Sequence, residues 1–133
     1  MSNTTSGKRI SINVEGADHK SPIPAASRIG NFMMTGHIYG RDPKTNEIVA
    51  GGANQVPLIF QNLRAILAAG GATPENVLKL EFSVKDLALR AAINKEWVVM
   101  FPDEHARPAR HVERSDNIAA PAEVSCEAFV VIT

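Results

Sequence analysis

The stretch Val77-Leu78-Lys79-Leu80-Glu81-Phe82-Ser83-Val84-Lys85 has the cleanest alternation of apolar and polar residues in the chain. Successive side chains of a β-strand point to opposite faces, so this alternation predicts a strand with one apolar and one polar face. The apolar face would carry Leu78, Leu80, Phe82 and Val84, and the polar face Lys79, Glu81, Ser83 and Lys85.

Amphipathic helices are predicted before and after this strand. Between residues 55 and 69, apolar side chains recur at three- and four-residue spacings and form one stripe, made of Val56, Ile59, Phe60, Leu63, Ile66 and Leu67. Pro57 suits the first turn, and Gly70-Gly71 ends the helix because glycine tolerates a left-handed cap. A second helix is expected from about residue 87 to residue 101, with Asp86 as its N-cap and Pro102 as its stop. Its buried side would carry Leu89, Ile93, Trp97, Met100 and Phe101.

Further strands are predicted at residues 9–14, 31–39, 111–115 and 124–132, with a short return strand at 47–49 after a turn at 42–46. Residues 15–27 are expected to be a loop because they hold two prolines and few periodic apolar residues.

Two helices can cover only one face of a sheet of this size, so the other face is expected to meet solvent or another subunit. The residues expected on this free face are Thr35, His37, Glu81, Ser83, Glu127, Met33, Tyr39, Phe129 and Val131. Such a mixture of polar and apolar side chains favours a subunit interface that contains a site over open solvent.

The composition is typical of a soluble single-domain protein. The 133 residues predict one domain, 1–133, with residues 1–8 as a flexible tail. Fourteen basic and fourteen acidic residues balance, which gives no electrostatic case for binding nucleic acid or a membrane surface. The lack of a signal sequence and of a long apolar run predicts a cytoplasmic location. Cys126 is the only cysteine and the four histidines lack ligand spacing, so we expect no disulfide and no metal site.

The segment Arg107-Pro108-Ala109-Arg110-His111 holds the main functional candidate. Pro108 interrupts any regular secondary structure before it, and Arg110 then lies just before a predicted strand. An arginine fixed at a strand start can present its planar fork to a carboxylate and form two parallel hydrogen bonds. The alternative is a surface arginine in an ordinary salt bridge.

Several short motifs, in their order and spacing, resemble the Rid family of reactive-intermediate deaminases, also called YjgF-like and often labelled L-PSP endoribonuclease. The matching landmarks are Gly30-Asn31, Thr35-Gly36, Asp42-Pro43-Lys44-Thr45, Gln55, Asn62-Leu63, Leu67-Ala68-Ala69-Gly70, Val77-Leu78-Lys79, Asn94, Phe101, Pro108-Ala109-Arg110 and Glu127-Ala128. The resemblance implies a chorismate-mutase-like α+β fold, a mixed sheet with two helices on one face, and a homotrimer whose sheets pack around the threefold axis. It also implies hydrolysis of enamines and imines to a 2-oxo acid and ammonia, without a cofactor.

The resemblance places the family's carboxylate-binding arginine on Arg110 and its hydrogen-bonding hydroxyl on Thr35. We therefore expect Arg110 to hold the substrate carboxylate, Thr35 to donate to the ligand, and Ser125 or Glu127 to position the water. His37 and Ile23 complete the expected substrate-binding set.

This sequence also departs from the family pattern. The active-site tyrosine falls near Ile23, the usual glutamine is His37, and a common cysteine is Val112. The acidic residue thought to help the water falls on Ser125, although a small gap would place Glu123 there. These changes argue against the archetypal 2-aminoacrylate enzyme. The longer segment 10–24 and the arrangement of Phe101-Pro102-Asp103 with Arg107-Pro108-Ala109-Arg110-His111 resemble the branch of 2-aminomuconate deaminase-like proteins.

Each candidate also has a purely structural interpretation. Thr35 would be a strand hydroxyl, Glu127 an ion-pair member with Arg110 itself, and His37 an interface residue. Cys126 is expected to be buried filler, and Trp97 to be a core or interface filler. Two other functions remain open: a non-catalytic trimer that senses small carboxylates, and an endoribonuclease or translation inhibitor, for which the sequence offers no phosphate-binding track.

Overall fold

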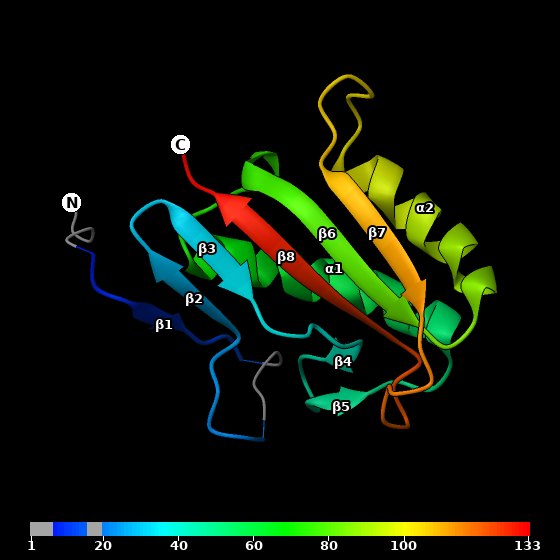
Figure 1. The fold of residues 1–133 in the computed structure, drawn as a ribbon. Helices are drawn as coiled ribbons and strands as arrows, with labels where there is room; N and C mark the ends of the chain where they lie inside the picture. The colour runs from blue at the N-terminus through cyan, green and yellow to red at the C-terminus, as the bar shows by residue number, and fades with distance from the viewer. Residues whose placement is uncertain (1–6, 16–19) are drawn as a thin grey trace.

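A computed structural model of the chain describes residues 7–15 and 20–133. One layer is a six-stranded sheet and the other contains two α-helices (Figure 1). The strands lie in the order β1-β2-β3-β8-β6-β7, and all neighbours are antiparallel except β6 and β7, which are parallel. The elements of the two layers are β1 (Ile10–Ile12), β2 (Ala26–Ile29), β3 (Phe32–Thr35), α1 (Gly52–Ala69), β6 (Val77–Val84), α2 (Arg90–Met100), β7 (Ala109–Arg114) and β8 (Val124–Val131). The strands β4 (Arg41–Asp42) and β5 (Glu47–Ile48) form a separate small ribbon.

Both helices lie on the same side of the sheet, behind it in the view of Figure 1, and leave the other face free. The predicted α+β class with one-sided helix coverage is therefore confirmed. The predicted apolar stripe of α1 is buried along its length, and α2 buries Ile93, Trp97 and Met100. Within the described segments, no helix combines the length and the apolarity that a bilayer crossing needs.

Local signals set several ends of the helical elements as the sequence predicts, but α1 begins at Gly52, before the predicted start at residue 55, so Pro57 lies inside the helix and not in its first turn. The Asp86 carboxylate accepts a hydrogen bond of 2.8 Å from the Ala88 N–H and caps a short 3-10 turn, Leu87–Leu89, that leads into α2. Gly71 has a φ of 82°, the left-handed conformation that ends α1. The turn Pro74–Asn76, capped reciprocally by Thr73 and Asn76, then leads into β6.

The predicted loop at residues 15–27 is wrong at its end, because Ala26–Ile29 forms strand β2. This four-residue strand pairs with β1 on one side and β3 on the other, and Gly30, with a φ of 56°, makes the turn into β3. Its stability comes from these two neighbours, which local composition does not report. Residues 16–19 of the loop and residues 1–6 of the predicted tail lie outside the described residues.

The two faces of β3 are the reverse of the expected ones. Met33 and Thr35 point toward the helices and are buried, whereas Phe32 and Met34 lie on the free face with 68% and 54% exposure. Gly70 makes room for Met33, since a Cβ at that glycine would come within 2.5 Å of the Met33 Sδ. Alternation separates the faces of a strand but does not say which one meets the core.

A β-bulge also changes the start of β6. The pairing with β8 shifts between Val77 and Lys79, so Val77 is buried and Leu78 is 62% exposed. Leu78 was expected on the apolar face with Leu80, and this assignment is wrong because the extra residue of a bulge reverses the alternation on one side of it. From Leu80 to Val84 the predicted faces are confirmed.

Gln55 in α1 joins three segments through one fully buried side chain. Its amide nitrogen donates to the carbonyls of Val49 (2.9 Å) and Pro121 (3.0 Å), and its amide oxygen accepts from the Glu123 N–H (2.9 Å). The loop before α1 and the loop before β8 are therefore held together by one amide that satisfies three backbone groups.

We predict that Gln55→Ala lowers the free energy of unfolding by roughly 1–3 kcal/mol, because it leaves buried backbone groups without partners. Gln61→Ala is the control, since Gln61 is an exposed glutamine on the same helix. Urea denaturation of both variants measures the difference. Equal losses in the two variants would contradict the role assigned to Gln55.

Candidate active site

Three predicted site residues meet on the free face of the sheet. An isolated bridge between Ile38 and Cys126 fixes the chain after β3 and brings His37 beside β8. The His37 Nδ1 lies 3.3 Å from the Ser125 Oγ, and its Nε2 lies 3.6 Å from the Glu127 carboxylate. These three residues can bind and orient a water molecule or a polar substrate group.

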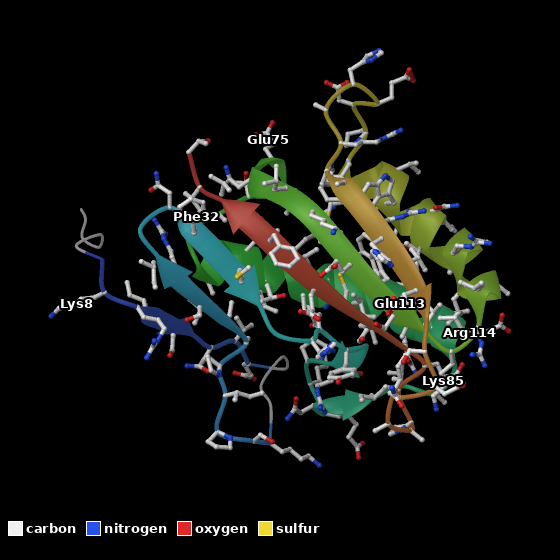
Figure 2. All side chains as sticks on the ribbon, in the orientation of Figure 1. Lys8, Phe32, Glu75, Lys85, Glu113 and Arg114 are labelled. Carbon is white, nitrogen blue, oxygen red and sulfur yellow. The ribbon has the colours of Figure 1, made fainter. Side chains whose placement is uncertain are left out.

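Polar residues of β6 and β7 extend this group across the free face. A small hollow of about 150 Å³ is lined by His37, Glu127 and five further residues, Glu81, Phe82, Ser83, His111 and Glu113. Glu113 lies 3.7 Å from the His111 Nε2, near the end of β7 in Figure 2. The hollow has room for a few water molecules or for a ligand of about the size of benzene.

Arg110 lies on the other face. It aligns with Leu80 of β6 in the parallel ladder and therefore points toward α2. Its guanidinium carbon lies 4.9 Å from the centre of the Trp97 ring. None of the ion pairs found in residues 7–15 and 20–133 includes Arg110. Burial and then the charge of Arg90 lower its pKa from the ordinary arginine value.

The ion pair considered between Arg110 and Glu127 is absent from the described residues. Glu127 aligns with Glu81 on the free face and contacts His37, whereas Arg110 aligns with Leu80 on the helix side. Adjacent register positions of a strand point to opposite faces, so the backbone keeps these two side chains apart within one chain.

The Thr35 hydroxyl is engaged within the chain. It accepts a hydrogen bond of 2.9 Å from the Ala128 N–H and donates one of 2.8 Å to the Gly36 carbonyl. The side chain thus continues the β3–β8 ladder where β3 ends, on the helix side of the sheet. Donation to a ligand would require the bond to Gly36 to be exchanged.

The remaining candidates lie apart from these groups. Ile23 is 53% exposed in the loop before β2. The Glu123 carboxylate accepts a hydrogen bond of 3.2 Å from the Gly52 N–H at the start of α1, a position where negative charge stabilises a helix. Glu123 therefore has a structural use that the sequence did not reveal.

Cys126 is fully buried, as predicted, and burial raises the pKa of its thiol well above the ordinary value, with smaller effects from Glu127 and Glu81. A thiol of this kind is a poor nucleophile. In the part of the chain that the structure describes, no group of three or more His, Cys, Asp or Glu residues is arranged to hold a metal ion.

A larger hollow of about 820 Å³ lies at the start of β6 and β7, and its lining includes Leu78, Phe101, Arg107, Ala109 and Phe129. It is mainly apolar and borders Ala109, the neighbour of Arg110. No sequence pattern indicated this hollow, because residues of the bulge at Leu78 and of the loop after α2 line it together.

Known proteins resemble this chain over most of its length. The sequence profile of the family described as Endoribonuclease L-PSP matches residues 22–132. A RutC family protein of Aquifex aeolicus is 29% identical over 117 residues, covering 84% of this chain and 94% of that protein. The 2-iminobutanoate/2-iminopropanoate deaminase of Escherichia coli is 29% identical over 104 residues, covering 77% and 81%. The crystal structure of RidA from an Antarctic Psychrobacter superposes with a TM-score of 0.85 at 26% identity, covering 92% and 99%.

We predict that Thr35→Val lowers the free energy of unfolding by about 1–3 kcal/mol, because the Ala128 N–H then lacks its acceptor inside the sheet. Thr35→Ser keeps the hydroxyl and is expected to retain most of the stability. Thermal unfolding and hydrogen exchange at the Ala128 amide measure the effect. An unchanged exchange rate in Thr35→Val would show that this hydrogen bond contributes nothing.

Proposed function

The chain belongs to the Endoribonuclease L-PSP family, which includes RutC and RidA proteins, and from this premise we propose that it is an enamine and imine deaminase. Its substrates would be small unsaturated amino acids of the 2-aminoacrylate or 2-aminomuconate type, and its products a 2-oxo acid and ammonia. The observation that carries the proposal is Arg110, whose charge has no carboxylate partner in the described residues and sits beside Arg90. A small carboxylate would supply the missing negative charge.

The reaction requires little acid–base catalysis from the protein. The enamine tautomerises to an imine, water adds to the imine carbon, and the resulting carbinolamine expels ammonia and leaves the 2-oxo acid. In our proposal Arg110 orients the substrate through its carboxylate. Ser125 or Glu127 positions the water, and His37, within reach of both, takes part in the same network. Thr35 and Ile23 are the remaining proposed contacts, the former after exchange of its internal hydrogen bond.

A complete site of this kind would require more than one copy of the chain. Arg110 and the His37–Ser125–Glu127 group lie on opposite sides of the sheet, so a single chain does not bring them together. We propose a homotrimer in which the sheets pack around the threefold axis, so that the β7 edge carrying Arg110 in one copy lies beside the free face of the next copy. The free face offers apolar area for this contact, including Phe32 at the hairpin tip labelled in Figure 2, Met34 and Phe129. This enzyme would work in the cytoplasm, without a cofactor.

A non-catalytic carboxylate sensor is the second candidate. Ile23 stands where the family pattern has a tyrosine, Ser125 stands where it has an acid, and the Thr35 hydroxyl is already engaged. These features weaken the catalytic part of the proposal without affecting carboxylate binding by Arg110. Ribonuclease activity, which the family description names, has less support because the free-face hollow is lined by three glutamates and would repel phosphates.

We predict that Arg110→Ala reduces kcat/KM for imine hydrolysis by about 10- to 100-fold or more, because it removes a charge-assisted pair of hydrogen bonds. Arg114→Ala is the matched control, since Arg114 is on the same face of β7 but pairs with Asp116 at 2.9 Å. A coupled assay would generate 2-aminoacrylate, and separately 2-aminomuconate, and follow ammonia release. Full activity of Arg110→Ala on both substrates would refute the assignment. Binding of 2-oxo acids through Arg110 without turnover would favour the sensor.

We predict that Met34→Glu converts the trimer to monomers, because a charge placed in an apolar interface is left without solvent or a partner. Val99→Glu is the control, since Val99 is 67% exposed on α2, on the outer layer. Analytical ultracentrifugation measures the assembly state of both variants. A trimer that survives Met34→Glu would exclude this part of the free face from the interface.

A further inference from the structure

We infer that Trp97 is the positioning residue of the anion site: its indole face holds the Arg110 guanidinium in a fixed orientation for the substrate carboxylate. This inference rests on the proposed carboxylate binding by Arg110 but not on catalysis. The sequence alone suggested only a core or interface filler at position 97. The pairing of β6 with β7 and the packing of α2 bring the indole and the guanidinium together.

The contact is close enough for a cation–π interaction. The guanidinium carbon lies 4.9 Å from the ring centre, inside the range of about 6 Å in which the ring attracts a cation. Tryptophan offers the strongest ring for this purpose. The indole itself is fixed, because Trp97 is 9% exposed and Phe101 packs edge-on against it at 4.8 Å between ring centres and an angle of 64°.

In the described residues, the hydrogen-bonding groups of this arginine have no internal partner. The guanidinium carbon lies over the indole ring, whereas a carboxylate would bond to the N–H groups at the edge of the guanidinium plane. None of the side-chain hydrogen bonds or ion pairs found in the described residues engages that edge. Arginine normally loses much rotamer freedom when it binds a ligand, so an arginine already held against a ring loses less.

The charges around Arg110 also favour binding of an anion at this site. Burial and Arg90 both disfavour the positive charge of Arg110 and lower its pKa. Arg90 and Trp97 are seven residues apart on α2 and therefore lie on the same side of the helix. The indole ring stabilises the positive charge of Arg110, which burial and Arg90 disfavour. A bound anion would offset these two unfavourable effects. Trp97 thus keeps Arg110 in place while the site is empty.

A carboxylate that stays bound throughout the reaction predicts a specific kinetic signature. Arg110 would hold it in the substrate and in the transition state alike, so weaker positioning should raise KM and leave kcat nearly unchanged. We expect Trp97→Leu to raise KM by roughly 2- to 30-fold, the factor that corresponds to losing one cation–π contact. A purely structural role would instead reduce the amount of active protein, which lowers kcat at constant KM.

Three variants separate these possibilities. Trp97→Leu removes the ring, and Trp97→Phe keeps a weaker ring and should recover part of the affinity. Ile93→Ala is the matched control, since Ile93 is fully buried one turn earlier on the same helix. Steady-state kinetics in the coupled assay give KM and kcat, and calorimetric titration with pyruvate gives the affinity. An unchanged KM and pyruvate affinity in Trp97→Leu, or an equal rise in Ile93→Ala, would overturn the inference.

The wild-type chain offers a test that needs no packing change. Trp97 is the only tryptophan, so intrinsic fluorescence reports directly on the ring beneath Arg110. Pyruvate should change the Trp97 emission saturably in wild type and leave it unchanged in Arg110→Ala. The inference would be contradicted if the wild-type emission did not change at pyruvate concentrations that calorimetry shows to be saturating. A saturable signal without ammonia release would sink the deaminase proposal and leave Trp97 as a positioning residue. Ammonia release with a KM that does not change in Trp97→Leu would support the deaminase proposal and contradict the positioning role of Trp97.

Discussion

The structure depends on one constraint: two helices cover one face of a six-stranded sheet, and in residues 7–15 and 20–133 no helix covers the other. Strands lie about 4.8 Å apart and a helix with its side chains is about 10 Å wide, so α1 and α2 suffice for a single face. All large buried side chains of the sheet therefore point to the helix side, Met33, Leu80, Phe82 and Val124 among them. The free face carries the side chains that do not enter this core. They include apolar residues and the polar group around His37.

The same constraint explains where the charged candidates lie. Along β7 and β8, each step of one residue changes the face, so Arg110 and Glu127 are separated by the thickness of the sheet although their strands both border β6. β7 is the last strand, and a residue at an edge is accessible from the side as well as from one face. Arg110 can therefore be packed on Trp97 and still be reached by a ligand at the rim. In the proposed trimer, a neighbouring copy would supply the water-positioning groups that are absent from the β7 edge around Arg110.

Sequence reasoning succeeded where the deciding interactions are local. The stripe of α1, the cap at Asp86 and the left-handed Gly71 depend on residues within a few positions of each other, and all three were predicted. It failed where partners are distant in the chain. Strand β2 exists because β1 and β3 flank it, and the bulge at Leu78 exists because β8 sets the register.

The site was predictable to a similar degree. Membership of the Rid-like family and the choice of Arg110 as a candidate followed from motifs, and the placement of His37 and Glu127 on one face followed from strand alternation. The contact of Arg110 with Trp97 did not follow from the sequence, because a helix residue and a strand residue thirteen positions apart meet only through the crossover from β6 to β7. The cap formed by Glu123 on α1 joins residues 71 positions apart and was equally hidden.

The departures from the family pattern carry different weights in this geometry. An imine is already unstable toward water, so its hydrolysis requires orientation more than acid–base strength. In the proposed site, Ile23 stands in place of the tyrosine of the family pattern and Ser125 in place of the acidic residue thought to help the water, and His37 with Glu127 would supply a substitute network on the same face as Ser125. Loss of the oriented cation would have no substitute of this kind in the described residues, where Arg110 is the only cation that lies over the Trp97 ring. The energetic centre of the proposed site is therefore the Arg110–Trp97 pair, and the residues around the water are the ones that evolution could exchange to suit a different substrate.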